Sequence, residues 1–320
     1  MEISNAASGG YGIDLDASLK GVVLSETLTL SVGTGGPLGA YNGAGTSPYS
    51  GSTAHNAVTL VGSATASGLI APTIASVINS ILPLNVSLGV PGLTTFVGGG
   101  NFLSPSPFPG YQTVSGYGAI ENLSVNVLGL LSLNLGVLES EATVAVNTTS
   151  ATSLGSLTGL ADANIAGLSL SVLGVSVPIS LSLAPNTTLA LGPLNLSLGA
   201  GLAAIDLDAY VKLVLNEQLF FIDDDTSVLT SGCAAATFSC GVATNALHLS
   251  VDVDGLVTAL GLTAAGITGD IELIMGHSYA YAKAVTISAP VPEPSTYALM
   301  LGGMAVLMAL SRRRKVNART

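Results

Sequence analysis

The chain has 320 residues, of which 48% are hydrophobic and only 8% charged, against about 25% charged in a typical globular protein. Five of its eight Lys and Arg residues lie in the last nine positions, so residues 1–293 set three basic side chains against all 19 acids. A body this acidic excludes a nucleic-acid partner, because such binding depends on neutralising phosphates with Lys and Arg. The hydrophobic content also excludes a highly charged disordered chain.

The first ten residues contain no export signal. Such a signal combines a basic segment with an apolar stretch of about 7–15 residues, and MEISNAASGG has neither. Either the true start lies upstream of Met1 or a signal peptide has been trimmed. We expect the first, because the other end of the chain carries a sorting pattern that is useless without export.

Long tracts of the body alternate apolar with small polar residues, the period of a strand with one buried face. From 123 to 137 the odd positions are apolar except for Gly129, and after Leu138 the even positions 142–146 are apolar instead. A one-residue shift moves every side chain to the other face of a sheet. We therefore expect a bulge or a corner near Leu138, and the same slip recurs at Leu173-Gly174.

No helical periodicity occurs outside the C-terminal tail. The sequence predicts an all-β body over residues 1–290, folded as an antiparallel sandwich of long bent strands, with a β-solenoid as the alternative. Two stretches rich in Gly, Pro, Ser and Tyr, 33–55 and 98–118, interrupt the alternation. We expect these to be long loops that cross the surface or separate subdomains.

The two cysteines, Cys233 and Cys240, bracket six small or uncharged residues. In an oxidising compartment this spacing favours a local disulfide, and the alternative is a pair of free buried thiols. A tetrahedral metal site is not expected, because no second Cys pair or nearby His completes the ligand set.

Many of the acids occur as acid-x-acid pairs, which would share one face of a strand. Two adjoining pairs with backbone carbonyls could supply the six to eight oxygen ligands of Ca²⁺. The alternative is that each pair only solvates a strand face, so we expect no cofactor, with Ca²⁺ as the lesser possibility. The candidate calcium ligands are Asp206, Asp208, Asp252 and Asp254.

The residues of catalysis show no recognisable pattern. His55, His248 and His277 stand in unrelated contexts without metal-ligand spacing, and no G-x-S-x-G elbow or P-loop is present. We expect His248 and His277 to fill positions at strand ends, and we predict that the protein is not an enzyme.

The C-terminus combines a turn, an apolar run and a basic cluster in that order. The apolar run, 297–310, would measure about 21 Å as a helix, so we predict a short transmembrane helix over 296–311 within a tail of 291–320. Basic residues stay cytoplasmic, which places the body outside. The turn is Val291, Pro292, Glu293, Pro294 and Ser295, and the basic cluster is Arg312, Arg313, Arg314 and Lys315.

These features resemble the PEP-CTERM sorting signal of Gram-negative bacteria. The resemblance implies an exosortase as partner, a transient inner-membrane intermediate, removal of the tail near Pro292-Glu293-Pro294, and delivery to the cell surface or extracellular matrix. Proteins with this signal typically accompany exopolysaccharide and biofilm production.

Most of the body resembles the choice-of-anchor P proteins, a group to which no activity is attached. The motifs that carry the resemblance are Ala184-Pro-Asn-Thr-Thr188, Leu215-Asn-Glu-Gln218, Asn245-Ala-Leu-His248 and Gly276-His-Ser-Tyr-Ala280. Two functions follow as hypotheses. One is a structural protein of the cell surface or matrix, and the alternative is a surface module that binds a glycan or another ligand, with or without Ca²⁺.

Overall fold

The chain divides into two units, Met1–Val285 and Thr286–Thr320. The computed structural model describes only residues of the first unit: 2–23, 26–55, 61–67, 95–103, 110–127, 131–147, 157–172, 174–179, 181, 184–194, 205–222, 225–229, 233, 239–259 and 268–285.

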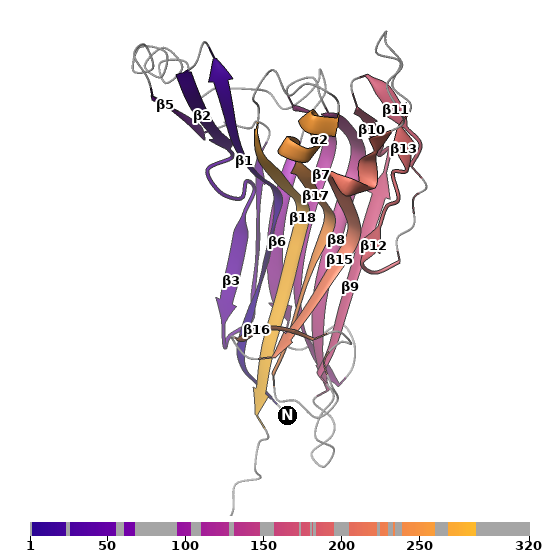
Figure 1. The fold of residues 1–320 in the computed structure, drawn as a ribbon. Coiled ribbons are helices and arrows are strands. Elements are labelled where there is room, and N and C mark those ends of the chain that lie inside the picture. Colours follow the sequence, from indigo (N-terminus) through magenta and orange to yellow (C-terminus); the bar gives the residue numbers. More distant parts are fainter. Residues whose placement is uncertain are drawn as a thin grey trace, which may run out of the picture. The chain divides into compact units, whose positions relative to one another are not determined.

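Most of the described strands belong to two antiparallel sheets (Figure 1). Sheet A has the order β12-β15-β17-β18-β1-β2-β5, with β3 paired to β1 and β16 to β15. Its strands are β12 (Thr187–Thr188), β15 (Val211–Ile222), β17 (Ser239–Asp252), β18 (Thr268–Val285), β1 (Glu2–Val23), β2 (Glu26–Gly33), β5 (Val61–Ser67), β3 (Tyr41–Gly45) and β16 (Asp225–Leu229).

Sheet B has the order β11-β10-β8-β7-β6-β4, with β9 paired to β8. Its strands are β11 (Val175–Val177), β10 (Ser169–Val172), β8 (Leu131–Asn147), β7 (Tyr111–Val127), β6 (Thr95–Leu103), β4 (Tyr49–His55) and β9 (Leu157–Ala166). The remaining elements are the short pair β13 (Pro193–Leu194) and β14 (Ile205–Asp206), the 3₁₀ turn η1 (Leu207–Ala209) and the helix α2 (Val253–Ala259).

The predicted all-β, antiparallel class is confirmed, since every strand pairing among the described residues is antiparallel. The β-solenoid alternative is wrong. In a solenoid each repeat contacts only its neighbours along the chain, whereas here the first strand, β1, pairs with the last, β18, from Glu2↔Val285 to Lys20↔Thr268.

The two sheets touch through glycines. A methyl group on Gly116 of β7 would overlap the carbonyl oxygens of Gly9 on β1 and Tyr279 on β18, and one on Gly98 of β6 would overlap the carbonyl of Gly10. Backbone therefore meets backbone where side chains normally hold two sheets about 10 Å apart. We call this level of the fold the glycine layer; its inward-facing residues are Gly10, Gly98, Gly116, Gly118, Ser140 and Ser278.

The glycine layer separates two hydrophobic clusters. On one side lie Ile3, Phe102, Val114, Val144 and Val242 with their neighbours. On the other side lies a larger cluster from both sheets, which α2 joins through Val253, Leu256 and Val257. Between them, the buried hydroxyl of Ser140 donates a hydrogen bond of 3.0 Å to Ser278 across the sheets, so these two buried side chains are paired.

Beside this layer, the long strands change which alternate residues point inward. In β8 Leu133 and Leu135 are buried, and the buried positions continue as Leu138, Ser140 and Ala142. The inversion predicted near Leu138 is therefore confirmed. β8 continues as one strand through the inversion. A residue with left-handed backbone, Asn122 with φ 52°, lies at this level on the partner strand β7.

The strands of sheet A make the same change of inward positions at the same level of the fold. The residue pairs Gly12–Ile13, Ala246–Leu247 and Met275–Gly276 each place two successive side-chain positions inward. Left-handed backbone at Gly276 (φ 58°) and Asn216 (φ 48°) accommodates the change. Because neighbouring strands invert together, the pairing register is the same on both sides, for example Tyr11↔His277 and Ile13↔Met275.

Two expectations about irregular segments are wrong. The stretches 33–55 and 98–118, predicted as loops, contain β3, β4 and much of β6 and β7. Gly98, Gly116 and Gly118 of the second stretch form the contact between the sheets, a role that composition alone does not distinguish from a loop.

The slip at Leu173-Gly174 is a hairpin instead of a bulge. β10 and β11 pair as Val172↔Val175, with Gly174 at φ 77° in the turn.

In the part of the chain that the structure describes, no helix is long and apolar enough to cross a membrane. The segment predicted to do so, 296–311, lies outside the described residues, as do the motif 291–295 and the basic cluster 312–315.

The glycine layer predicts that Gly116→Ala destabilises the fold by at least ~3 kcal/mol, because the added methyl overlaps backbone that cannot move without parting the sheets. Gly136→Ala is the control, because its added methyl would lie 3.1 Å from the carbonyl of Ala166, a residue of the same sheet, and so would overlap less. Denaturant unfolding followed by circular dichroism measures both. Equal stability of the two variants would contradict a backbone contact between the sheets.

Candidate functional site

The outer face of sheet A carries a cluster of polar side chains at the level where the strands invert. Its members come from four adjacent strands, β15, β17, β18 and β1. We call it the Glu217 cluster; it consists of Tyr11, Glu217, Asn245, His248, Glu272 and His277.

The inversion explains how Asn245 and His248 reach the same face. Residues three apart on a regular strand point to opposite faces. In β17 both Ala246 and Leu247 are directed inward and fully buried, so the outward positions on either side of them are Asn245 and His248. Both then face the same partner on β15.

That partner is Glu217, whose Oε2 accepts two hydrogen bonds. Asn245 donates one through Nδ2 at 2.8 Å, and His248 donates the other through Nδ1 at 2.9 Å. Nε2 of His248 lies 3.2 Å from Oε1 of Glu272 on β18, where it is buried but not aligned for a hydrogen bond. His248 thus stands between two carboxylates and links three strands.

These contacts favour the charged forms of both His248 and Glu217. The hydrogen bond to Glu217 raises the pKa of His248, against the opposing effect of burial. The same hydrogen bond lowers the pKa of Glu217, with Asn245 adding to the effect.

His277 is held neutral in the same cluster. Burial lowers its pKa to about 4. Its Nδ1 lies 2.6 Å from Oδ1 of Asn245; since the amide nitrogen of Asn245 donates to Glu217, Oδ1 accepts, and the imidazole proton sits on Nδ1. The ring stacks on Tyr11 with centroids 4.6 Å apart, and burial raises the pKa of Tyr11.

The structure brings together the four short motifs noted in the sequence. Asn186 of the first motif donates through its backbone N–H to the carbonyl of Asn216, and its Oδ1 accepts from the backbone N–H of Gln218, both at 2.8 Å. The other three motifs contain the Glu217 cluster apart from Tyr11 and Glu272. The expectation that His248 and His277 occupy strand ends is wrong, because both lie inside long strands.

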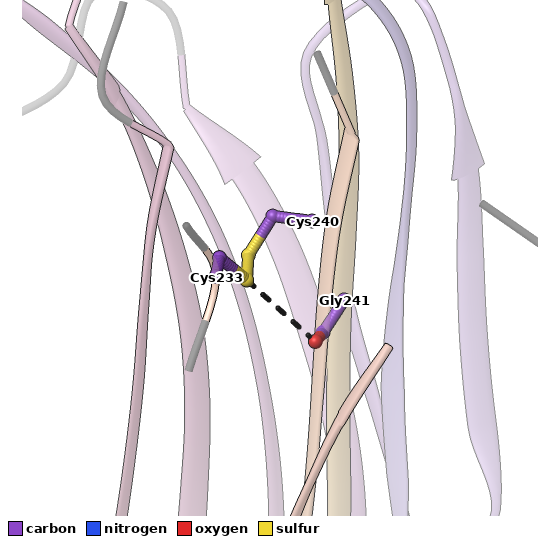
Figure 2. Close-up of a disulfide and its surroundings, with 3 residues drawn as sticks. All are labelled: Cys233, Cys240 and Gly241. Atoms are coloured by element: carbon purple, nitrogen blue, oxygen red, sulfur yellow. Dashed lines mark hydrogen bonds between the residues drawn. A yellow bond between two sulfur atoms is a disulfide. The ribbon is translucent and has the colours of Figure 1, made fainter. Parts of the chain in front are cut away.

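The predicted disulfide between Cys233 and Cys240 is present in the structure (Figure 2). The two Cα atoms are 5.6 Å apart, within the range that a disulfide spans. Sγ of Cys233 lies 3.9 Å from the carbonyl oxygen of Gly241, and Cys240 is fully buried in the smaller hydrophobic cluster. The bond therefore ties residue 233 to β17.

The candidate calcium ligands serve local backbone instead of sharing strand faces. Oδ1 of Asp206 accepts from the N–H of Asp208 at the start of η1. Asp208 accepts from the N–H groups of Leu191 and Gly192, at 2.6 and 3.2 Å. Short capping turns of this kind are a common use of Asp.

The second acidic pair flanks the start of α2. Oδ1 of Asp252 accepts from the N–H of Gly255 at 2.9 Å, and Asp254 lies in the first turn of the helix. A carboxylate at this end of a helix is favoured by the unpaired N–H groups. Within the described ranges, no group of three or more His, Cys, Asp or Glu residues could hold a metal ion.

Comparison with known proteins identifies the tail. Residues 290–315 match the PEP-CTERM protein-sorting motif, a range that includes the turn at 291–295 and the basic cluster at 312–315. The motif indicates an exported protein that is processed by an exosortase and reaches the cell surface through the membrane. No curated protein and no solved structure matches the chain in these comparisons.

The disulfide predicts that non-reduced exported protein has no alkylatable thiols and gains about 2 Da on reduction. Cys233→Ser should lower stability by about 2.5 kcal/mol, the chain-entropy value for so small a ring. Mass spectrometry before and after reduction checks the bond. Two thiols labelled without reduction would contradict it.

The His248–Glu217 contact predicts a pH window of stabilisation. The raised pKa of His248 stabilises the fold below the ordinary value of 6.5, and this contribution disappears as the pH rises through the raised pKa. The lowered pKa of Glu217 stabilises above 4.5, and its contribution disappears as the pH falls through the lowered pKa. The pair should therefore contribute most between pH 4.5 and 6.5.

The measurement is the difference in unfolding free energy between the native chain and His248→Gln across pH 3–9 (roughly the range where carboxylates and His titrate). The difference should peak inside that window. A difference that is independent of pH would show that His248 contributes only packing. His277→Gln is the matched variant: it should improve stability at acid pH, because a buried neutral His opposes folding once the unfolded chain binds its proton.

Proposed function

We propose that the body of this exported protein is a non-catalytic structural component of the cell surface or extracellular matrix, associated with exopolysaccharide in a biofilm. The observation that carries the proposal is the combination of a PEP-CTERM motif at 290–315 with a body in which the Glu217 cluster joins neighbouring strands by hydrogen bonds.

The Glu217 cluster supports the non-catalytic part. Glu217 accepts from both Asn245 and His248, and His277 donates to Asn245. An active site needs an acid, base or nucleophile aimed at a substrate. Here Glu217, Asn245 and Nδ1 of both histidines are directed at one another across neighbouring strands, which stabilises the sheet at the level where its inward phase inverts.

The surface chemistry supports the matrix part. Outer strand faces carry Ser, Thr and Asn side chains, for example Ser124 on β7, whose hydroxyl donates to Asn134 at 2.6 Å. Such surfaces make hydrogen bonds with hydroxyl-rich polymers, while the excess of acids repels polyanions. A disulfide is typical of the oxidising space outside the cytoplasm.

The alternative, a surface module that binds a glycan or another ligand, is favoured by one observation. A hollow of about 300 Å³ lies on the outer face of sheet B, lined by an aromatic ring and several hydrogen-bonding groups. This is the lower end of the size of ligand pockets.

Processing is tested by replacing Pro292, Glu293 and Pro294 with alanine in the full-length chain. The native protein should reach the extracellular fraction with a C-terminus near residues 290–296, whereas the variant should stay in the membrane fraction with 312–315 attached. Ser288→Ala, outside the matched range, is the control. Mass spectrometry of both fractions is the readout, and mature surface protein that retains 312–315 would mean a permanent anchor.

The structural role is tested by deleting the gene for this protein in its host. The deletion strain should retain less polysaccharide in its matrix, and the intact chain should restore it, while the purified protein should leave the polymer's length unchanged. An unaltered matrix would remove the structural role, and measurable cleavage of the polymer would contradict the non-catalytic one.

A further inference from the structure

The hollow on the outer face of sheet B has a regular construction. Strand pairing places Tyr117 of β7, Glu141 of β8 and Asp162 of β9 in one row. Ala119, Glu139 and Asn164 form the next row along the same strands. The six residues line the hollow, and the short side chain of Ala119 leaves the space between its longer neighbours.

Tyr117 supplies an aromatic surface of fixed orientation. A methyl group on Gly99 of the adjacent strand β6 would overlap the end of its ring, so the ring lies across the bare backbone of Gly99. An aromatic side chain that covers a glycine on the next strand is a stable arrangement in sheets. One ring face rests on the sheet, and the half-buried Tyr117 is one of the residues that line the hollow.

The opposite side of the hollow supplies hydrogen-bond acceptors. Glu141 is oriented by Thr143, whose hydroxyl donates to Oε1 at 3.1 Å and itself lies 2.7 Å from Oγ of Ser115. Oδ1 of Asp162 accepts from the N–H of Ala163 at 2.9 Å. These bonds fix one oxygen of each carboxylate and so set the direction in which the other can accept.

The charge on this face limits the ligand. The sequence contains no Lys or Arg between Lys20 and Lys212, so neither residue type belongs to any strand of sheet B. Carboxylates with no nearby cation disfavour an anionic ligand and favour one rich in O–H or N–H donors. A flat aromatic face favours a ligand that also has an apolar C–H surface.

We infer that this hollow binds a carbohydrate unit that carries hydroxyl or amino groups and no acid. The pyranose ring packs its C–H face on Tyr117, and its hydroxyls donate to Glu139, Glu141 and Asp162, with Asn164 able to donate or accept. The grid of side chains measures about 10 by 7 Å from strand spacing, which suits a sugar unit. The inference rests on the proposed contact with polysaccharide and assigns it to one site.

A bound cation is the competing occupant of a carboxylate-lined hollow. Two observations favour the sugar. No group of three metal-ligating side chains in the described part of the chain is placed to hold an ion, and Tyr117 has no role in a cation site. The experiment therefore includes calcium.

Binding is measured by calorimetry with the full-length protein in detergent, using cellohexaose, a chitosan hexamer and hexaguluronate as neutral, cationic and anionic probes. The first two should bind and hexaguluronate should not. Tyr117→Ala and Asp162→Asn should each weaken binding at least tenfold, whereas Tyr117→Phe should keep it. Tyr279→Ala is the control, because Tyr279 is a tyrosine of sheet A that pairs with a glycine, Gly9, and lies outside the hollow.

Circular dichroism of each variant shows whether the fold is retained. The inference is overturned if native protein binds neither cellohexaose nor the chitosan hexamer, if binding requires Ca²⁺, if hexaguluronate binds equally well, or if Tyr279→Ala weakens binding as much as Tyr117→Ala. Export and matrix retention are measured separately, so a protein that is retained in the matrix but binds no probe refutes this site and leaves the proposed function standing.

Discussion

The direct backbone contact between the two sheets is the constraint on which the rest of the structure depends. Gly116 and Gly98 of sheet B meet the carbonyls of Gly9, Gly10 and Tyr279 with no room for a methyl group. Two sheets that touch in this way cannot slide, because a shift of one residue would bring a side chain against backbone. The contact therefore fixes the register of both sheets at once and divides the apolar interior into two clusters, each of which packs with ordinary side chains.

The Glu217 cluster follows from the same geometry. Close to the glycine layer the strands change which alternate positions face inward, and Ala246 and Leu247 point inward in succession. Asn245 and His248 are thereby placed on one face, within reach of Glu217 on the next strand. The hydrogen bonds of the Glu217 cluster each join two different strands. They therefore stabilise the sheet at the level where its backbone departs from a regular pleat.

The sequence predicts features that depend on local pattern, but it does not predict features that depend on which strands pair. Alternation identified the strands and the inversion at Leu138, and the short Cys233–Cys240 spacing identified a disulfide. Composition predicts loops for glycine-rich strands such as β6, because a glycine that touches another sheet has the same composition signal as one in a turn. His248 and Glu217 are 31 residues apart, so only the strand order could bring them together. A spacing of three in Asn245-Ala-Leu-His248 would have indicated the cluster only if the inversion in β17 had been located first.

The two outer faces consequently have different chemistry. The three basic residues that precede the tail, Lys20, Lys212 and Lys283, all lie on strands of sheet A. On that sheet Glu217, Asn245 and His277 also bond within the Glu217 cluster. Sheet B carries acids and no Lys or Arg, and Tyr117 lines the same hollow as three of these acids. Removal of the tail by an exosortase would take away the remaining five basic residues and leave this asymmetry unchanged. Polar groups that already bond to one another gain little from a ligand. We therefore propose sheet B, and not sheet A, as the face that recognises an uncharged or cationic polymer.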